Sequence, residues 1–222
     1  MERAFISYNY VMEIFRREEM RYMPVREVQV KIVLIGDGAV GKTSIAQRFL
    51  GKEFTHEYIM TVGVDFYKKE TKVEFPEYGE VRFIWHIWDL AGQPHWKHVR
   101  PAFYLGARGA ILVFDIANRD SYQNAIEWAK EFIRHAGGKY PLVLVGNKID
   151  LRENIPGCIT PKEGRELAKE LSNLFGFEVP YIETSALLNI NIDKAFQELG
   201  KLIVKRTVEE LERKKSSLED IG

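Results

Sequence analysis

The sequence lacks cysteine pairs, an excess of charge of one sign, and any long apolar run. Cys158 is the only cysteine among 222 residues, which excludes an internal disulfide and a cysteine-based metal cluster. Lys and Arg total 32, as do Asp and Glu, so no net charge attracts nucleic acid from a distance. No apolar run approaches the ~20 residues of a membrane-spanning helix. We therefore expect a cytoplasmic protein that neither binds nucleic acid nor spans a membrane.

Recognisable membrane signals are also missing near the two ends of the sequence. Glu2 excludes N-myristoylation, and the C-terminal residues contain no cysteine to prenylate. Apolar side chains at helical spacing predict an amphipathic helix in residues 1–23, which a proline at position 24 ends. Residues 1–27 carry five Arg and five Glu, and this balance predicts membrane contact that is weak at best.

Apolar β-branched runs alternate with helical patterns from residue 28 onward. Strands are expected near 30–35, 82–88, 110–116, 141–145 and 181–182, and helices over 43–50, 122–133, 161–174 and 192–211. Alternation of this kind builds parallel βαβ units with helices on both faces of one sheet. Residues 64–75 instead form an antiparallel hairpin with the next strand. We predict an α/β fold with a six-stranded, mostly parallel sheet and one antiparallel edge strand. The domain spans 28–206, between an N-terminal extension (1–27) and a C-terminal helix extension and tail (207–222).

A glycine-rich segment follows the first strand and precedes the first helix of this domain. Its sequence, GDGAVGKT at 36–43, matches G-x-x-x-x-G-K-[ST] in full. Glycines let the backbone N–H groups wrap around phosphate, Lys42 reaches the β- and γ-phosphates, and the Thr43 hydroxyl ligates Mg²⁺. The segment predicts a P-loop NTPase fold and these nucleotide-binding residues: Gly36, Asp37, Gly38, Ala39, Val40, Gly41, Lys42, Thr43 and Ser44.

A second motif, WDLAGQ at 88–93, ends another strand, where ligands of α/β sheets bind. Asp89 can hold a water ligand of Mg²⁺, the Gly92 N–H can approach a γ-phosphate, and Gln93 can orient an attacking water. Thr61, which lies between the two motifs, can supply a second hydroxyl to the metal. We predict a metal site of Thr43, Thr61 and Asp89, and catalytic roles for Gln93, Lys42 and Thr61.

The segment Asn147-Lys148-Ile149-Asp150 follows a later strand and predicts the choice of base. The Asp150 carboxylate can accept from both N1–H and the 2-amino group of guanine, whereas adenine offers neither donor. Lys148 can lie across the base, and the Asn147 amide can tie this loop to the phosphate loop. After the last strand, the backbone N–H groups of ETSA (183–186), Ser185 and Ala186 included, can meet the guanine O6.

The motifs resemble, in chain order, those of the Ras superfamily of small GTPases: GDGAVGKT, TVGVDF, WDLAGQ, NKID and ETSA. The resemblance covers residues 28–206 and is greatest to the Rab branch. It implies a Mg²⁺-dependent GTP/GDP switch, a monomer, with effector, activator and exchange-factor partners. It also implies that Phe54 packs against guanine, that Tyr58 covers the phosphates, and that Gly38 stands where a side chain would crowd the γ-phosphate. G-protein alpha subunits have an arginine at the position of Tyr58, so slow unassisted hydrolysis is expected.

Three features depart from the Rab pattern. Pro94 and His95 follow Gln93 where Rab proteins have an acidic and a basic residue, a lipid-accepting cysteine is missing, and the N-terminal helix is additional. The last two would fit an archaeal member of the superfamily. Two alternatives stay open: a nucleotide-locked binding module without turnover, and a metabolic P-loop kinase. The intact Gln93, Thr61 and Gly38 disfavour the first, and the lack of a clear cationic lid disfavours the second.

Overall fold

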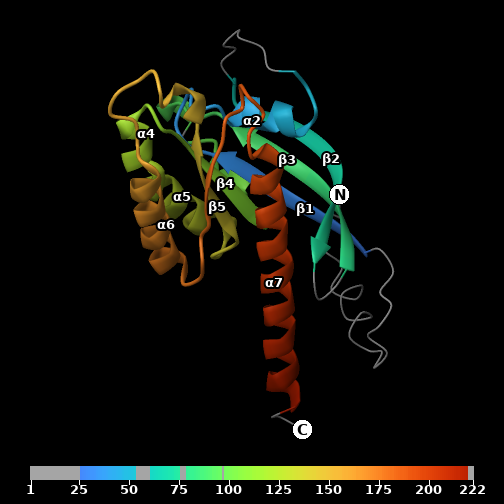
Figure 1. The fold of residues 1–222 in the computed structure, drawn as a ribbon. Helices are drawn as coiled ribbons and strands as arrows, with labels where there is room; N and C mark the ends of the chain where they lie inside the picture. Colours follow the sequence, from blue (N-terminus) through green and yellow to red (C-terminus); the bar gives the residue numbers. More distant parts are fainter. Residues whose placement is uncertain (1–25, 54–60, 76–78, 97, 220–222) are drawn as a thin grey trace.

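A six-stranded sheet forms the centre of the protein (Figure 1). The computed structural model describes residues 26–53, 61–75, 79–96 and 98–219. The sheet order is β2-β3-β1-β4-β5-β6, and every neighbouring pair is parallel except β2 with β3. The strands are β1 Arg26–Ile35, β2 Val64–Phe75, β3 Gly79–Leu90, β4 Gly109–Asp115, β5 Leu142–Asn147 and β6 Tyr181–Glu183. The predicted sheet with one antiparallel edge strand is confirmed.

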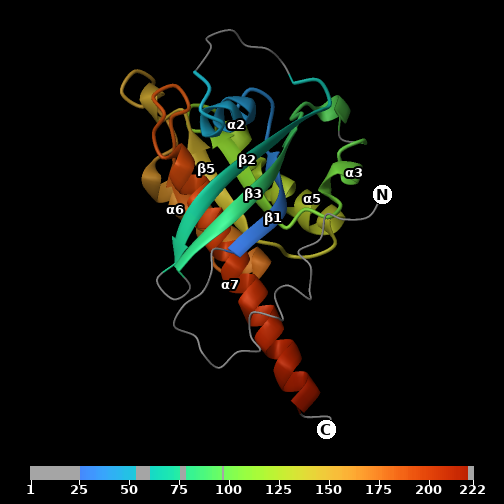
Figure 2. The ribbon, with the colours of Figure 1, turned by 90° about the vertical axis from the view of Figure 1, so that its right-hand side faces the viewer.

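Helices cover both faces of this sheet (Figures 1 and 2). They are α2 Lys42–Phe49, α3 Pro101–Tyr104, α4 Arg119–Gln123, α5 Ala125–Ala136, α6 Pro161–Phe175 and α7 Ile192–Glu219, with short 3₁₀ turns at Pro94–Trp96 and Ile149–Leu151. One prediction was wrong: the single helix over 122–133 is two helices, α4 and α5, that meet at Asn124. The side chain of Asn118 accepts from the Ser121 N–H and so starts α4 at Arg119, three residues before the predicted helix.

Strand β1 shows why both faces need helices. Val30, Ile32 and Leu34 point into one buried cluster, whereas Val33 and Ile35 point into the other. The first cluster lies against α2 and α7, where the rings of Phe49 and Phe196 stack with centroids 3.5 Å apart. The second lies against α3, α4, α5 and α6. The two clusters hold the strands, and with them the loops at their carboxyl ends, in fixed positions.

Helix α7 is the longest element and continues beyond the sheet (Figures 1 and 2). The predicted boundary between residues 206 and 207 lies inside this one helix. The Asn191 carbonyl accepts the Ala195 N–H at 3.1 Å, which places Asn191 at the N-cap position of α7, and its side chain donates to the Glu183 carbonyl. Within the described ranges, no helix combines the length and the apolarity that crossing a bilayer requires.

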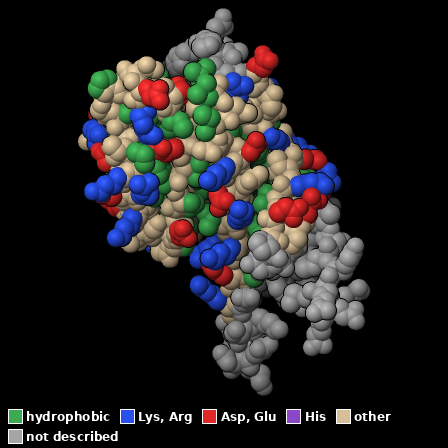
Figure 3. All heavy atoms as spheres, viewed as in Figure 1, with side chains coloured by type: hydrophobic (Ala, Val, Ile, Leu, Met, Phe, Trp, Pro, Cys, Tyr) green, Lys and Arg blue, Asp and Glu red, His purple; other side chains and the backbone are tan. Residues whose placement is uncertain are grey.

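The surface in Figure 3 mixes acidic and basic side chains. Ion pairs at least partly exposed to solvent join the edge strand β2 to its neighbour β3, such as Lys72 with Glu80 at 2.8 Å. Exposed pairs of this kind contribute little to stability, and their main effect is to keep the edge of the sheet polar.

Candidate functional site

The phosphate loop, residues 36–43, connects β1 to α2 at the carboxyl edge of the sheet. Its backbone has positive φ angles of 133° at Gly36, 63° at Ala39 and 99° at Gly41. A Cβ added at Gly36 would lie 2.1 Å from the carbonyl oxygen of Val113, so only glycine fits there. The strained loop therefore depends on its glycines, as the motif predicted.

Lys42 lies buried inside this loop. Its Nζ donates to the carbonyl oxygens of Gly36 and Asp37, at 2.8 and 2.6 Å. Burial lowers the pKa of Lys42 to about 8, although the carboxylates of Asp89 and Asp37 favour its charged form. A buried cation that donates to two backbone carbonyl groups is well placed to bind phosphate oxygens.

The three predicted metal ligands come together beside Lys42. The hydroxyl oxygens of Thr43 and Thr61 are 2.8 Å apart, and the Thr43 hydroxyl donates to Oδ2 of Asp89. Asp89 is fully buried, and its Oδ1 has no hydrogen-bond partner among the described residues. Burial raises the pKa of Asp89 to about 6, against the opposing effects of Lys42 and Thr43. Hydroxyl and carboxylate oxygens are the donors that Mg²⁺ prefers, so these residues fit that ion.

Gln93 faces the phosphate loop at Gly38. A Cβ added at Gly38 would lie 3.7 Å from Cγ of Gln93, and the side-chain oxygen of Gln93 is buried with no partner in the described part of the chain. Gly92 packs against the same loop, because a Cβ there would lie 2.3 Å from the carbonyl carbon of Asp37. The two residues thus bring the end of β3 into contact with the phosphate loop.

Asn147 joins three of the motifs. This residue is 1% exposed, and its Nδ2 donates to the Val40 carbonyl in the phosphate loop at 2.9 Å. Its Oδ1 accepts from the Thr184 hydroxyl at 3.0 Å and from the Ala186 N–H at 3.2 Å. The predicted tie between Asn147 and the phosphate loop is present, and the same amide also holds the ETSA segment.

The other base-reading residues lie around Asn147. The Ser185 hydroxyl donates to Oδ1 of Asp150. Lys148 has a left-handed backbone (φ 70°), and its Nζ forms an ion pair with Asp115 at 2.7 Å.

The backbone N–H groups of ETSA are engaged within the protein. Those of Thr184 and Ser185 donate to the carbonyls of Gly146 and Ile190, and that of Ala186 makes the 3.2 Å contact with Asn147. Their contact with guanine O6 stays a prediction. It requires the Ala186 N–H to donate to guanine O6 as well as to Oδ1 of Asn147.

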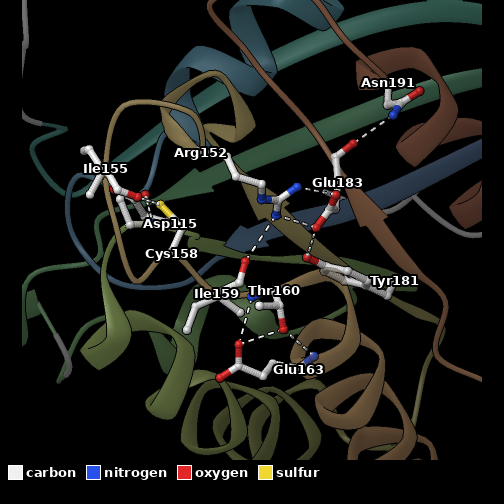
Figure 4. A network of polar contacts seen from close by, with 11 residues as sticks. Asp115, Arg152, Ile155, Cys158, Ile159, Thr160, Glu163, Tyr181, Glu183 and Asn191 are labelled. Atoms are coloured by element: carbon white, nitrogen blue, oxygen red, sulfur yellow. Dashed lines mark hydrogen bonds and ion pairs between the residues drawn. The ribbon is translucent and has the colours of Figure 1, made fainter.

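Sequence reasoning missed an ion pair that links the two base-reading loops (Figure 4). Arg152 donates to both carboxylate oxygens of Glu183, at 2.8 and 2.6 Å, and to the Ile159 carbonyl at 3.1 Å. The Tyr181 hydroxyl also donates to Glu183 at 3.0 Å. Arg152 follows Asp150 by two residues and Glu183 is the first residue of ETSA, so opposite charges at the two motifs were the available signal.

Sequence reasoning also missed the residues that hold Asp37 of the phosphate loop. The indole Nε1 of Trp128 and the amide Nδ2 of Asn124 donate to its two carboxylate oxygens, at 2.6 and 2.8 Å. The two donors lie about ninety residues from Asp37 in the sequence, so no local pattern could have indicated them.

Phe54 and Tyr58 lie outside the described residues, and Ser44 lies in the first turn of α2, directly after Thr43. In the described ranges, no group of three or more His, Cys, Asp or Glu side chains converges as a metal site would require.

Comparisons with known proteins agree with this geometry. The model of the Ras family matches residues 31–205. The Ypt/Rab-type GTPase YPT7 of Saccharomyces cerevisiae is 36% identical over 176 residues, which cover 78% of this chain and 80% of that protein. The Ras-related proteins RABG3f of Arabidopsis thaliana and Rab7 of Pisum sativum are 33% and 34% identical over 189 residues, 83% of this chain and 87% of each relative. The chain therefore belongs to the Ras family of small GTPases and is similar to its Rab members.

Proposed function

We propose that this protein is a Mg²⁺-dependent switch that binds GTP, hydrolyses it to GDP and phosphate, and presents its switch loops to partner proteins. The observation that carries the proposal is a pair of buried oxygens, Oδ1 of Asp89 and Oε1 of Gln93, without partners among the described residues. An unpaired buried oxygen is costly, and folded proteins rarely leave one without a purpose. A water on Mg²⁺ would satisfy the first oxygen, and the attacking water would satisfy the second.

The residues around these oxygens would bind the phosphate groups and the metal ion. The Lys42 ammonium would exchange its two carbonyl contacts for β- and γ-phosphate oxygens, whose negative charge favours the protonated form of the lysine. Thr43, Thr61 and Asp89 would hold Mg²⁺, which neutralises negative charge on the phosphate oxygens when bound. The backbone N–H groups at the start of α2 complete the phosphate site.

Gln93 would orient the water that attacks the γ-phosphate. Its Oε1 accepts a hydrogen bond from that water, and its position against Gly38 directs the amide toward the phosphate loop.

Partner binding would depend on the segment that begins at Thr61. Val62 and Phe66 follow it with 71% and 54% of their surface exposed, and exposed apolar side chains of this size favour a protein partner. Because Thr61 would be drawn to the metal when a γ-phosphate is bound, Val62 beside it would move with the nucleotide state, whereas Phe66 is held in β2 opposite Trp88.

Single-turnover hydrolysis of preloaded GTP tests the proposal. We expect a rate of about 10⁻⁴–10⁻³ s⁻¹, the range of a Ras-type site without a donated arginine. Gln93→Leu should slow hydrolysis at least about tenfold, because the water loses its acceptor, while GTP binding is retained. Gln123→Leu, a matched change at an exposed position of α4, should leave the rate unchanged. A wild-type rate of about 1 s⁻¹, or an unaltered rate in Gln93→Leu, would refute the assigned roles. Retained binding without measurable turnover would identify a nucleotide-locked binding module instead.

A further inference from the structure

A buried arginine connects the catalytic loop to a rigid helix. Arg100 lies directly before α3 and is 4% exposed. Its Nε and Nη2 donate to the two carboxylate oxygens of Glu131 on α5, at 2.8 and 3.0 Å. Its third donor, Nη1, reaches the backbone carbonyl of Gln93 at 3.3 Å. One guanidinium group thus joins the residue proposed to orient water to helix α5.

The partners of Arg100 are themselves held in place. The Tyr104 hydroxyl donates to Glu131 at 3.0 Å, and the Arg100 guanidinium lies 4.2 Å from the centre of the Trp128 ring. Trp128 in turn donates to Asp37 of the phosphate loop. Since Trp128 and its neighbours on α5 are buried in the second core cluster, this helix offers Arg100 a rigid anchor.

The same contacts keep Arg100 from acting on the phosphate groups directly. Glu131 takes two of its donors and balances its charge, and Trp128 covers the guanidinium. The arginine is therefore committed within the protein and is not free to contact a transferring phosphoryl group.

We propose that Arg100 is a positioning residue for GTP hydrolysis, which fixes the backbone of Gln93 so that its side chain faces the phosphate loop at Gly38. The inference rests on the proposed function, because it assigns a role within that reaction. The planar guanidinium can bind both oxygens of Glu131 and still present a third donor to Gln93, whereas an ammonium group cannot match this fork. A displacement of about 1 Å at a catalytic group can cost roughly a hundredfold in rate, so the hydrogen bond from Arg100 to the Gln93 carbonyl should affect the rate of hydrolysis.

Arg100→Lys tests the inference, because it keeps the positive charge and loses the fork. We expect single-turnover hydrolysis to slow by roughly 10- to 100-fold, with unchanged dissociation rates of GDP and GTP. Amide hydrogen exchange should rise in residues 92–96, since the Gln93 carbonyl that loses Arg100 also accepts the Trp96 N–H. Arg119→Lys is the matched control: Arg119 pairs with Glu163 at 2.8 Å on the surface, away from Gln93, and should change neither readout.

Glu131→Gln is the second variant, in case Arg100→Lys does not fold. It weakens the ion pair that holds Arg100 while Arg100 and Gln93 themselves stay unchanged. This variant should also hydrolyse GTP more slowly than the wild type. If either folded variant hydrolyses GTP at the wild-type rate, the inference is overturned. It is equally overturned if nucleotide dissociation changes as much as hydrolysis, because that indicates general loosening of the fold. If the wild type does not hydrolyse GTP, or Gln93→Leu is as fast, the proposed function itself fails.

Discussion

Replacement of Asp150 by Asn should change the base that the protein prefers. In the wild type, the Asp150 carboxylate is expected to accept from the N1–H and the 2-amino group of guanine, while the Ser185 hydroxyl donates to its Oδ1. In Asp150→Asn, the side-chain oxygen keeps the hydrogen bond from Ser185. The new amide NH₂ then stands where Oδ2 was and faces the donors of guanine.

The size of the effect follows from the bonds that are lost. A hydrogen bond to a charged group contributes about 1.5–3 kcal/mol, so two of them contribute roughly 3–6 kcal/mol. This corresponds to a loss of GDP affinity of about 10²- to 10⁴-fold. Xanthine carries a carbonyl where guanine has its 2-amino group, so xanthosine diphosphate should regain part of this loss.

Competition of unlabelled nucleotides against a fluorescent diphosphate measures the preference directly. The wild type should prefer GDP to both xanthosine diphosphate and ADP, and Asp150→Asn should prefer xanthosine diphosphate to GDP. Glu153→Gln removes the same charge from an exposed position three residues away and should leave the wild-type order intact. ADP that competes as well as GDP in the wild type, or GDP preference retained in Asp150→Asn, would refute the reasoning.

Three further outcomes follow from the structure. Gly38→Val should bind nucleotide but hydrolyse it more slowly, because a Cβ there would already contact Gln93 at 3.7 Å and the two further methyl groups of valine would crowd its side chain; equal single-turnover rates would contradict this. Arg152→Ala should release GDP roughly tenfold faster, as measured with a fluorescent analogue, because its paired hydrogen bonds to Glu183 hold the base-reading loops. The Thr160 N–H, with Arg119 and the Thr160 hydroxyl, lowers the pKa of Glu163 from 4.5 to about 2, so this carboxylate stabilises the fold above pH 4.5 and ceases to do so as the pH falls toward 2. Urea unfolding should therefore show a stability difference between wild type and Glu163→Gln at pH 6 that shrinks in acid, and a constant difference would contradict the assigned cause.

The fold and the centre of the site could be predicted because their signals are local. The apolar run of β1 specifies a strand buried on both faces, and the spacing in 36–43 specifies a loop that requires glycine at positions 36 and 41. The motif residues Thr43, Thr61 and Asp89 then meet at one edge of the sheet. Thr43 follows the carboxyl end of β1, Asp89 lies near the carboxyl end of β3, and Thr61 precedes the amino end of the antiparallel strand β2. Each step needs only the periodicity of a segment or the order of the motifs.

The supporting contacts could not be predicted because they join distant segments. Nothing near Asp37 in the sequence indicates that Trp128 and Asn124 will contact it. Nothing near Gln93 indicates that Glu131 will bind Arg100, the residue that contacts the Gln93 carbonyl. The break at Asn124 was also hidden, since the apolar spacing of the region fits one continuous helix. These features depend on how α5 packs, which is a property of the whole core.

The groups that make the site recognisable are those that a folded protein would otherwise avoid. Lys42 is a buried cation whose pKa is lowered to about 8, and Asp89 is a buried carboxylic acid whose pKa is raised to about 6. Both are less stable where they lie than they would be in water, so the surrounding core has to offset their cost. The buried amide of Asn147 and the ion pair of Arg152 contribute to this stability, because their hydrogen bonds join the loops of the site to one another within the protein. A triphosphate and its metal would relieve the cost at Lys42 and Asp89 together, so the free energy that the burial of these two groups costs would become part of the binding free energy of the nucleotide.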